Sequence, residues 1–175
     1  MIDRAEYPVA VQWTGEKRGV IGSVEGLPTL EVAAPPEFDG HAGIWSPEHL
    51  YVASVASCYM TTLLAIAGVW RVEIRSLEIP AVGVVERGED RMYSIPSIVL
   101  RPRITLASEK DLPRAERLAE KAENVCMVSR SLKTEVTLEA TFSVAEAVDA
   151  EQEPVHEPEQ PPWPAAVAPI ACSPR

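Results

Sequence analysis

The sequence has few cysteines and no cluster of basic residues. Its 175 residues include three cysteines, 6% aromatic residues, and 16 lysines and arginines against 26 aspartates and glutamates. Nucleic-acid binding is not expected, because a phosphate backbone requires a basic surface with interleaved aromatic side chains. No cationic start followed by an apolar stretch and a cleavage site is present, so we expect a cytoplasmic protein. In that reducing compartment, two of the cysteines are better interpreted as a catalytic or redox pair than as a structural disulfide.

The sequence also lacks the close ligand spacing of a metal site. His41 and His49 could be imagined as ligands together with Cys58, but no second cysteine lies near them in the sequence. We interpret both histidines as surface or helix-capping residues. We therefore expect neither a metal nor a prosthetic group.

Acidic residues and prolines are concentrated near the C-terminal end. Residues 145–175 contain six acidic residues, one basic residue and seven of the 16 prolines, and they carry −5 of the net charge of −10. Such a segment cannot bury enough apolar surface to offset its loss of chain entropy. We predict a domain over 1–146 and a disordered tail over 147–175, with Cys172 as a bystander. The alternative is that Trp163 and the prolines beside it dock on a partner as an extended segment.

The longest segment without charge covers residues 50–70 and includes Cys58. It is long enough to span a bilayer, but serines and threonines dilute it and no lysine or arginine cluster at its ends would fix an orientation. We predict a long buried central helix that begins at Ser46-Pro47-Glu48, with a single membrane span as the alternative. A helix that is apolar on all faces needs partners on every side, so we expect a sheet on one face and a second subunit on another.

The remaining pattern predicts an α+β fold with antiparallel sheets around that helix. The expected strands cover, in chain order, residues 9–13, 20–24, 29–33, 72–85, 98–106 and 134–144. The strand over 98–106 returns from a hairpin loop, and Pro102 in it suggests an edge or a bulge. An amphipathic helix begins near Asp111 and Pro113. Its expected apolar stripe is Leu112, Ala115, Leu118, Ala119 and Ala122.

Cys58 and Cys126 are the two thiols of the predicted domain. A single thiol inside an apolar helix is ordinarily inert, because burial raises its pKa and suppresses the thiolate. A second thiol at a predicted helix start favours a reactive pair instead. The candidate cations that could stabilise a thiolate are Lys17, Arg18, Arg71 and Arg130.

Three segments resemble the OsmC/Ohr family of thiol peroxidases, and they occur in the family's order and spacing. They are Trp13-Thr14-Gly15 through Arg18-Gly19, then Ser46-Pro47-Glu48-His49-Leu50 followed by Ala56-Ser57-Cys58, and finally the segment from Ala122 to Lys133 that contains Cys126. The resemblance implies an OsmC-like fold in which two chains intertwine into a homodimer. The active site would then lie between the subunits.

The resemblance also implies a chemistry for these residues. Cys58 would be the peroxidatic thiol that reduces organic hydroperoxides, and Cys126 would be the resolving thiol that closes a disulfide. An external dithiol would restore the enzyme. Arg18 would hold the thiolate, and Glu48 would orient Arg18 through a charge-assisted pair.

Arg18 receives this role because the other position used in the family, before a Phe-acid-Gly segment, is Glu37 in this chain. Glu48 and Cys58 stand ten residues apart, roughly 15 Å along one helix, so one guanidinium would contact both more readily if they came from different chains. The alternative for Glu48 is a plain first-turn carboxylate. The alternative for the whole protein is a non-catalytic relative that binds a small apolar molecule in the interface pocket.

Overall fold

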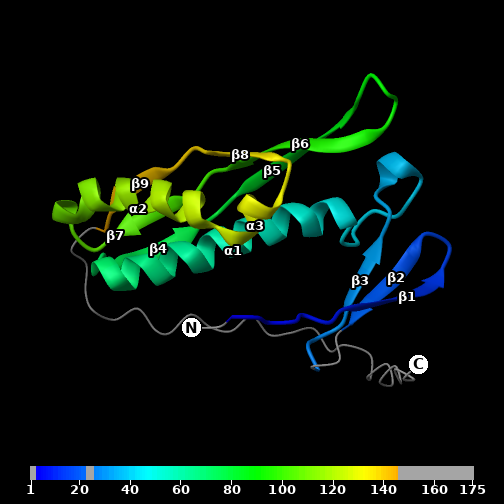
Figure 1. Cartoon of the computed structure of the whole chain (residues 1–175), viewed down its shortest axis with the longest axis horizontal. Helices are drawn as coiled ribbons and strands as arrows, with labels where there is room; N and C mark the ends of the chain where they lie inside the picture. Colours follow the sequence, from blue (N-terminus) through cyan, green and yellow to red (C-terminus); the bar gives the residue numbers. More distant parts are fainter. Residues whose placement is uncertain (1–2, 23–25, 146–175) are drawn as a thin grey trace. The chain divides into compact units, whose positions relative to one another are not determined.

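The computed structural model describes residues 3–22 and 26–145, which divide into two compact units (Figure 1). The first unit contains the described residues up to Pro47, and the second contains those from Glu48 onward. We describe each unit by itself. The boundary predicted near residue 146 and the segment over 147–175, with Cys172 and Trp163, lie outside the described residues.

The first unit is a three-stranded antiparallel sheet with the order β1-β2-β3. The strands are β1 (Ala10–Gly15), β2 (Arg18–Gly22) and β3 (Leu30–Ala33), which confirms the predicted meander. The proline-rich loop that follows contains the short 3-10 helix η1 (Pro36–Phe38). Lys17 donates from Nζ to the Phe38 carbonyl at 2.6 Å and thereby ties this loop to the β1–β2 turn.

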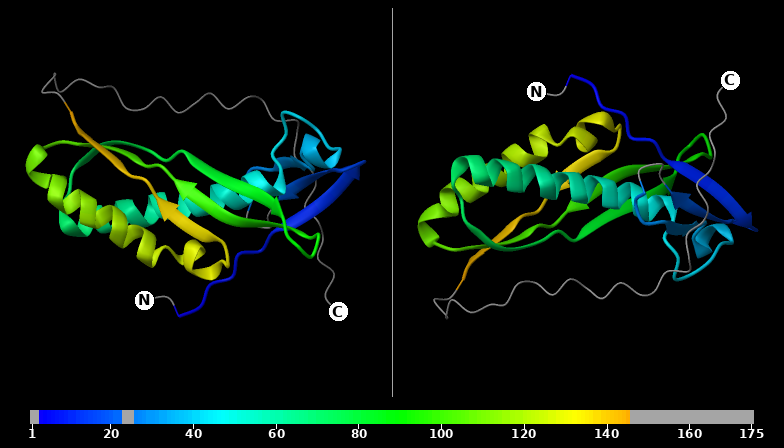
Figure 2. Two further views of the ribbon diagram at one scale, coloured as in Figure 1. Left: turned by 90° about the horizontal axis from the view of Figure 1, so that it is seen from above. Right: turned by 90° about the horizontal axis from the view of Figure 1, so that it is seen from below.

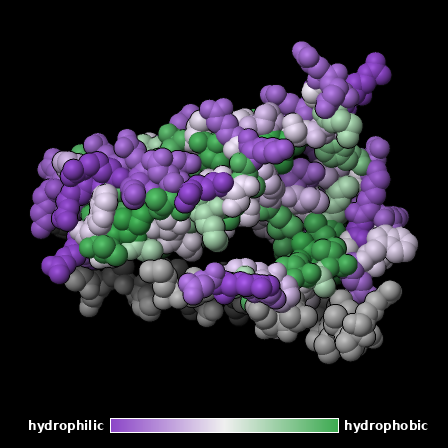
Figure 3. All heavy atoms as spheres, viewed as in Figure 1, coloured by the Kyte–Doolittle hydropathy of each residue, from purple (hydrophilic) through white to green (hydrophobic). Residues whose placement is uncertain are grey.

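The second unit begins with the long helix α1 (Pro47–Trp70), which starts where the sequence predicts. Its buried residues recur every four positions, at Val55, Tyr59, Leu63 and Ala67, and so form one stripe. Other apolar side chains of α1 remain exposed in the single chain: Met60 by 38%, Leu64 by 46% and Val69 by 79%. Figure 3 shows apolar side chains at the surface over the C-terminal half of this helix. The predicted burial of α1 is therefore confirmed for one stripe, and the expected cover of another face by a second subunit stays a prediction.

The same helix has the length and composition of a membrane span. Its 24 residues have a mean hydropathy of 1.8 over the most apolar window. Core helices of soluble proteins pass the same test. Length and composition alone therefore do not distinguish a membrane span from a core helix.

Two three-stranded sheets pack in the second unit. One contains β4 (Ile74–Glu78), β7 (Arg103–Leu106) and β9 (Thr141–Val144), and the other contains β5 (Ala81–Arg87), β6 (Tyr93–Leu100) and β8 (Glu135–Leu138). β8 pairs with β6, and β9 with β7, in parallel. The prediction of antiparallel sheets is thus correct for the pairs β5–β6 and β4–β7 and wrong for the pairs β6–β8 and β7–β9. The helical segment before β8 makes parallel pairing possible, because parallel strands need a long crossover connection.

The single strands predicted over 98–106 and 134–144 are each two strands in different sheets. The chain leaves the β5–β6–β8 sheet at Arg101-Pro102, where proline has no N–H to continue the ladder. The Pro102 carbonyl instead accepts the Thr141 amide at 2.8 Å, and the Leu100 carbonyl accepts the Glu139 amide at 2.8 Å. The chain therefore passes from one sheet to the other between β6 and β7 and again between β8 and β9, and these two crossing points are hydrogen-bonded to each other.

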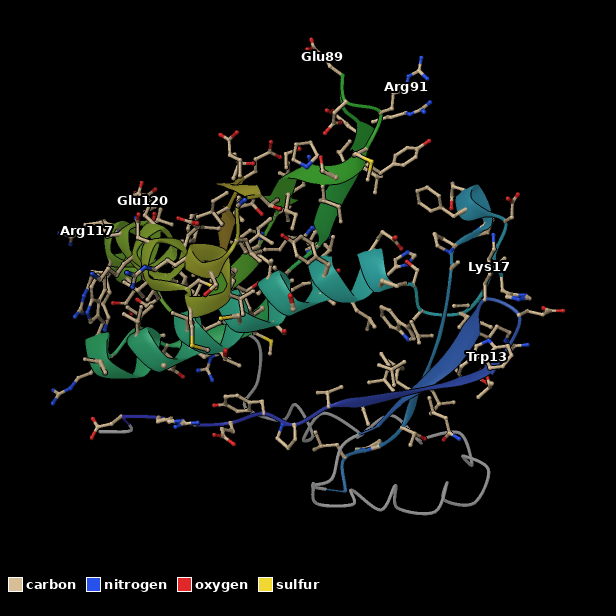
Figure 4. The ribbon with its side chains drawn as sticks, turned by 45° about the vertical axis from the view of Figure 1, so that its right-hand side comes forward. Trp13, Lys17, Glu89, Arg91, Arg117 and Glu120 are labelled. Atoms are coloured by element: carbon tan, nitrogen blue, oxygen red, sulfur yellow. The ribbon has the colours of Figure 1, made fainter. Side chains whose placement is uncertain are left out.

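Helices α2 (Leu112–Val125) and α3 (Met127–Ser131) follow β7. Four residues of the predicted apolar stripe of α2, Ala115, Leu118, Ala119 and Ala122, are buried. Arg117 and Glu120 point outward from the opposite side of this helix (Figure 4). α2 crosses α1 (Figure 2), and the hydroxyl of the buried Tyr59 donates to the Ala119 carbonyl at 3.4 Å.

Arg114 on α2 caps the C-terminal end of α1. Its Nη2 donates to the Trp70 carbonyl at 2.6 Å, and its Nη1 lies 3.8 Å from the carboxylate of the buried Asp111. The last turn of α1 has no basic residue of its own, so this bond satisfies a carbonyl that the helix leaves unpaired. We expect Arg114→Ala to lower the free energy of unfolding by about 1–2 kcal/mol in urea denaturation.

Arg117 provides the matched control for this prediction. It stands three residues later on α2, and its Nε donates at 3.2 Å to Pro113 within its own helix. We expect Arg117→Ala to change the stability by less than about 0.5 kcal/mol. Equal losses for the two variants would contradict the capping role of Arg114.

A candidate thiol redox site

The second unit brings together two cysteines that stand 68 residues apart in the sequence. Cys58 lies in the middle of α1, and Cys126 is the one residue between α2 and α3. The Cys126 amide donates to the Glu123 carbonyl at 3.0 Å, and its own carbonyl accepts the Arg130 amide at 3.1 Å. The second thiol therefore stands at a helix start, as predicted. Because α2 crosses α1, this junction lies over the middle of the long helix.

The α2–α3 junction contacts the Cys58 sulfur, which accepts the Val128 amide at 3.5 Å. The two thiols are close enough for each to shift the pKa of the other. Neither cysteine is in a disulfide. Cys58 is half-buried, whereas Cys126 is fully buried. A small molecule can thus reach the first sulfur more readily than the second.

Four neighbouring groups lower the pKa of the Cys58 thiol, and one of them, the Val128 amide, donates to the sulfur at 3.5 Å. Burial raises the pKa of the Cys58 thiol, but these groups together outweigh it and hold the pKa below its ordinary value. In decreasing order of effect, they are the Val128 amide, the Cys126 thiol, the Thr62 hydroxyl and the Met127 amide. Cys58 is therefore the more reactive of the two thiols.

The environment of Cys126 has the opposite effect. Burial raises the pKa of the Cys126 thiol, and the neighbouring Cys58 raises it further. The hydroxyl and amide of Ser129 oppose this shift without overcoming it, and the Ser129 hydroxyl makes no well-aligned hydrogen bond. Cys126 is therefore the weaker acid of the two thiols.

The candidate cations are not among the groups that lower the pKa of Cys58 in this unit. Arg71 follows the end of α1, roughly 20 Å along the helix axis from Cys58. Arg130 is exposed on α3. In the part of the second unit that the structure describes, the groups that lower the pKa of Cys58 are neutral.

Arg18 and Lys17 belong to the first unit. Arg18 opens β2, and its guanidinium lies 3.7 Å from the Glu31 carboxylate on β3. Lys17 lies in the β1–β2 turn, 3.9 Å from the Asp39 carboxylate (Figure 4). The predicted contact of Arg18 with Cys58 stays a prediction.

Glu48 lies in the first turn of α1 and has an unsatisfied oxygen. Its Oε2 is buried and has no hydrogen-bond partner among the described residues. A buried carboxylate oxygen without a partner is costly. This position therefore favours an incoming donor, such as a cation from outside the described unit.

Neither histidine that the sequence suggested lies in a metal cluster. Among residues 3–22 and 26–145, no group of three or more histidine, cysteine or acidic side chains could hold a metal ion. His41 lies in the first unit, 3.1 Å from the Glu16 carboxylate. The chemistry that the described residues support is that of the thiol pair.

Sequence reasoning missed three of the four groups that lower the pKa of Cys58. The Val128 and Met127 groups are backbone amides, and backbone groups leave no residue-type signature. Thr62 could have been found, because residues four apart on a helix share a face. Its position four residues after Cys58 was the signal in the sequence.

Comparisons with known proteins agree on one family. The family model described as OsmC-like protein matches residues 40–141. The uncharacterized protein YmaD of Bacillus subtilis is 30% identical over 148 residues, which cover 82% of this chain and 97% of that protein.

Solved structures of similar fold carry related descriptions. An OsmC-like protein of unknown function from Vibrio cholerae has a TM-score of 0.73 at 23% identity, covering 79% of this chain and all of that one. An organic hydroperoxide resistance protein OsmC from Legionella pneumophila has a TM-score of 0.64 at 24% identity, covering 81% and 100%. The organic hydroperoxide resistance protein OhrB of Bacillus subtilis has a TM-score of 0.57 at 20% identity, covering 79% and 98%. At these identities, the likeness indicates a common fold.

Proposed function

The chain belongs to the OsmC-like protein family, and from this premise we propose that it reduces organic hydroperoxides with the thiol of Cys58. The observation that carries the proposal is the placement of the α2–α3 junction over Cys58, where the Val128 amide donates to the half-buried Cys58 sulfur at 3.5 Å and Cys126 is buried nearby. The pKa of the Cys58 thiol is lowered and that of the Cys126 thiol is raised, which supports it. A peroxidase that resolves its own intermediate requires this asymmetry. The hydroperoxide substrate is supported by similar structures described as organic hydroperoxide resistance proteins.

The proposed reaction has two steps. The Cys58 thiolate attacks the distal oxygen of the hydroperoxide, the O–O bond breaks, and the products are a sulfenic acid on Cys58 and an alkoxide, which takes a proton from solvent. The Cys126 thiol then attacks the sulfenic sulfur, an S–S bond forms, and the hydroxyl leaves as water with the proton of Cys126. An external dithiol reduces the disulfide and restores both thiols. The cycle needs no metal and no prosthetic group.

Arg18 and Glu48 are proposed to complete the site. The unsatisfied oxygen of Glu48 is suited to a guanidinium, which would form a charge-assisted pair. Because α1 runs without interruption from Pro47 to Trp70, Glu48 and Cys58 of one helix stand roughly 15 Å apart along its axis. If one Arg18 contacts both groups, these groups come from two different chains.

We propose that the protein is an intertwined homodimer with this site at its subunit interface. The exposed apolar face of α1 supports this assembly, and so does β1, where Val11 and Trp13 are exposed by 65% and 74%. Apolar side chains that are exposed together in one chain are typical of an interface between subunits. A cytoplasmic location without membrane or nucleic-acid partners, and a domain boundary near residue 146, stay predictions from composition.

Thiol counting tests the pairing of the cysteines. After treatment with one equivalent of tert-butyl hydroperoxide, we expect alkylation and peptide mass spectrometry to show Cys58 and Cys126 lost together as one disulfide, because the segment that contains Cys126 already contacts the Cys58 sulfur through the Val128 amide. Treatment of the Cys126→Ser variant controls for oxidation without disulfide formation. Two free thiols after treatment would contradict the peroxidase and favour the alternative, a non-catalytic relative that binds a small apolar molecule.

A further inference from the structure

A tyrosine, a threonine and a main-chain carbonyl form a chain of two hydrogen bonds in the second unit. The Tyr51 hydroxyl on α1 lies 2.7 Å from Thr134 Oγ1, which in turn lies 2.7 Å from the Ile95 carbonyl on β6. A threonine hydroxyl has one proton and a carbonyl only accepts, so Thr134 donates to Ile95 and Tyr51 donates to Thr134. Both bonds are partly buried, where water competes with them less than at the surface.

These two bonds fix the downstream end of the segment that contains Cys126. Thr134 stands eight residues after Cys126, beyond α3 and directly before β8. The pairing of β8 with β6 begins one residue later, at Glu135 opposite Ser97. The Thr134 hydroxyl therefore ties the connection between α3 and β8 to α1 and to β6 before the strand ladder begins.

The same segment is attached to α1 on its upstream side as well. Ala119 of α2 is buried, and its carbonyl accepts the Tyr59 hydroxyl of α1 at 3.4 Å. Cys126 and α3 thus lie between two attachments to one helix, and α3 lies beside that helix in Figure 1. Cys58 stands between the two tyrosines, two turns after Tyr51, or roughly 10 Å along the helix axis. The two attachments therefore enclose the place where the thiols meet.

We propose that Tyr51 is a positioning residue for disulfide formation, which acts through Thr134 to hold the α2–α3 junction against α1 with Cys126 beside Cys58. This inference rests on the proposed function, because it assigns a further residue to the same thiol pair. Tyr51 acts through the main chain of the segment. A thiol that is held near its partner reacts as if it were at a higher concentration, and the loss of one attachment lowers that effective concentration.

The test is the equilibrium between the reduced full-length protein and oxidised glutathione, without hydroperoxide. The exchange converts the two protein thiols into the Cys58–Cys126 disulfide and one oxidised glutathione into two reduced glutathione molecules. The oxidised fraction is measured by acid quenching, alkylation and peptide mass spectrometry. We expect Tyr51→Phe, which keeps the ring and removes the hydroxyl, to lower the equilibrium constant about three- to tenfold.

Three further variants separate this bond from general effects of substitution. Thr134→Val removes the hydroxyl that accepts from Tyr51 and should lower the constant at least as much, whereas Thr134→Ser keeps a hydroxyl and should restore it. The combination of Tyr51→Phe with Thr134→Val should match Thr134→Val alone, because both changes remove the same bond. Thr137→Val makes the same exchange at an exposed position of β8 and should leave the constant unchanged.

An unchanged or higher constant for Tyr51→Phe would overturn the assignment. A lower melting temperature with an unchanged constant would do so too, since that is the effect of a bond that only stabilises the fold. Additive losses in the combined variant would contradict a shared bond.

Hydroperoxide turnover is measured separately on wild type and Tyr51→Phe. A lower constant for Tyr51→Phe, in a protein whose wild type reduces no hydroperoxide, would refute the proposed function and leave the role of Tyr51 standing. Turnover with an unchanged constant would refute the role of Tyr51 alone. A wild type that forms no Cys58–Cys126 disulfide at any glutathione ratio would overturn both.

Discussion

Cys58→Ser is expected to reduce hydroperoxide turnover to background, a loss on the order of 1,000-fold or more, because a serine hydroxyl stays protonated where this thiol ionises. The donors around the sulfur stabilise a thiolate and cannot make an alkoxide from serine at neutral pH. The measurement is consumption of tert-butyl hydroperoxide with dithiothreitol as reductant. The variant should keep its fold, since Cys58 is only half-buried and the exchange is close in size.

Cys126→Ser is the matched variant for that experiment. Its Cys58 should still be oxidised by one equivalent of hydroperoxide, but the sulfenic acid should persist and react with dimedone, because the resolving sulfur is gone. Wild type should show no such adduct. If Cys58→Ser keeps substantial turnover, or if Cys126→Ser cannot be oxidised at all, the two roles are assigned wrongly.

Leu64→Asp is expected to have the second large effect, on assembly. Leu64 is 46% exposed in the single chain, so an aspartate there would cost one isolated chain little. If a second chain covers this face of α1, the same change buries an unpaired charge and costs several kcal/mol. We therefore expect light scattering of the dilute variant to show a loss of the dimer, together with a lower melting temperature.

Lys121→Asp provides the control, because Lys121 is exposed on α2 and the change introduces the same carboxylate. It should leave the mass in solution and the melting temperature nearly unchanged. A Leu64→Asp protein that behaves like wild type would place the exposed face of α1 outside any interface. A wild type that is a folded monomer at all concentrations would overturn the homodimer.

The sequence predicted where helices begin and which faces are buried better than it predicted which strands pair and in which direction. Pro47 marks the start of α1, and the spacing of Ala115, Leu118 and Ala122 marks the buried face of α2. Alternation of apolar residues does not say which strand lies alongside or in which direction. For this reason the parallel pairs and the change of sheet at Pro102 could not be predicted.

The candidate site was predictable only in part. The two cysteines were identified from residue type and from the family resemblance, since 68 residues separate them and their proximity depends on how α2 crosses α1. The amides of Val128 and Met127 act through the backbone, where any residue type provides the same donor. Within the described second unit, the groups that lower the pKa of Cys58 are neutral, and the expected contact with Arg18 of the first unit stays a prediction.

Cys126 is both a thiol and the whole connection between two helices. Its amide ends α2, its carbonyl starts α3, and it stands between them with φ −59° and ψ 115°. A side chain drawn into a disulfide there pulls on the one pair of dihedral angles that fixes the direction of α3 relative to α2. Oxidation also removes the negative charge that the Val128 amide faces. Disulfide formation at Cys126 would thus act directly on the main chain that sets the direction of α3 relative to α2.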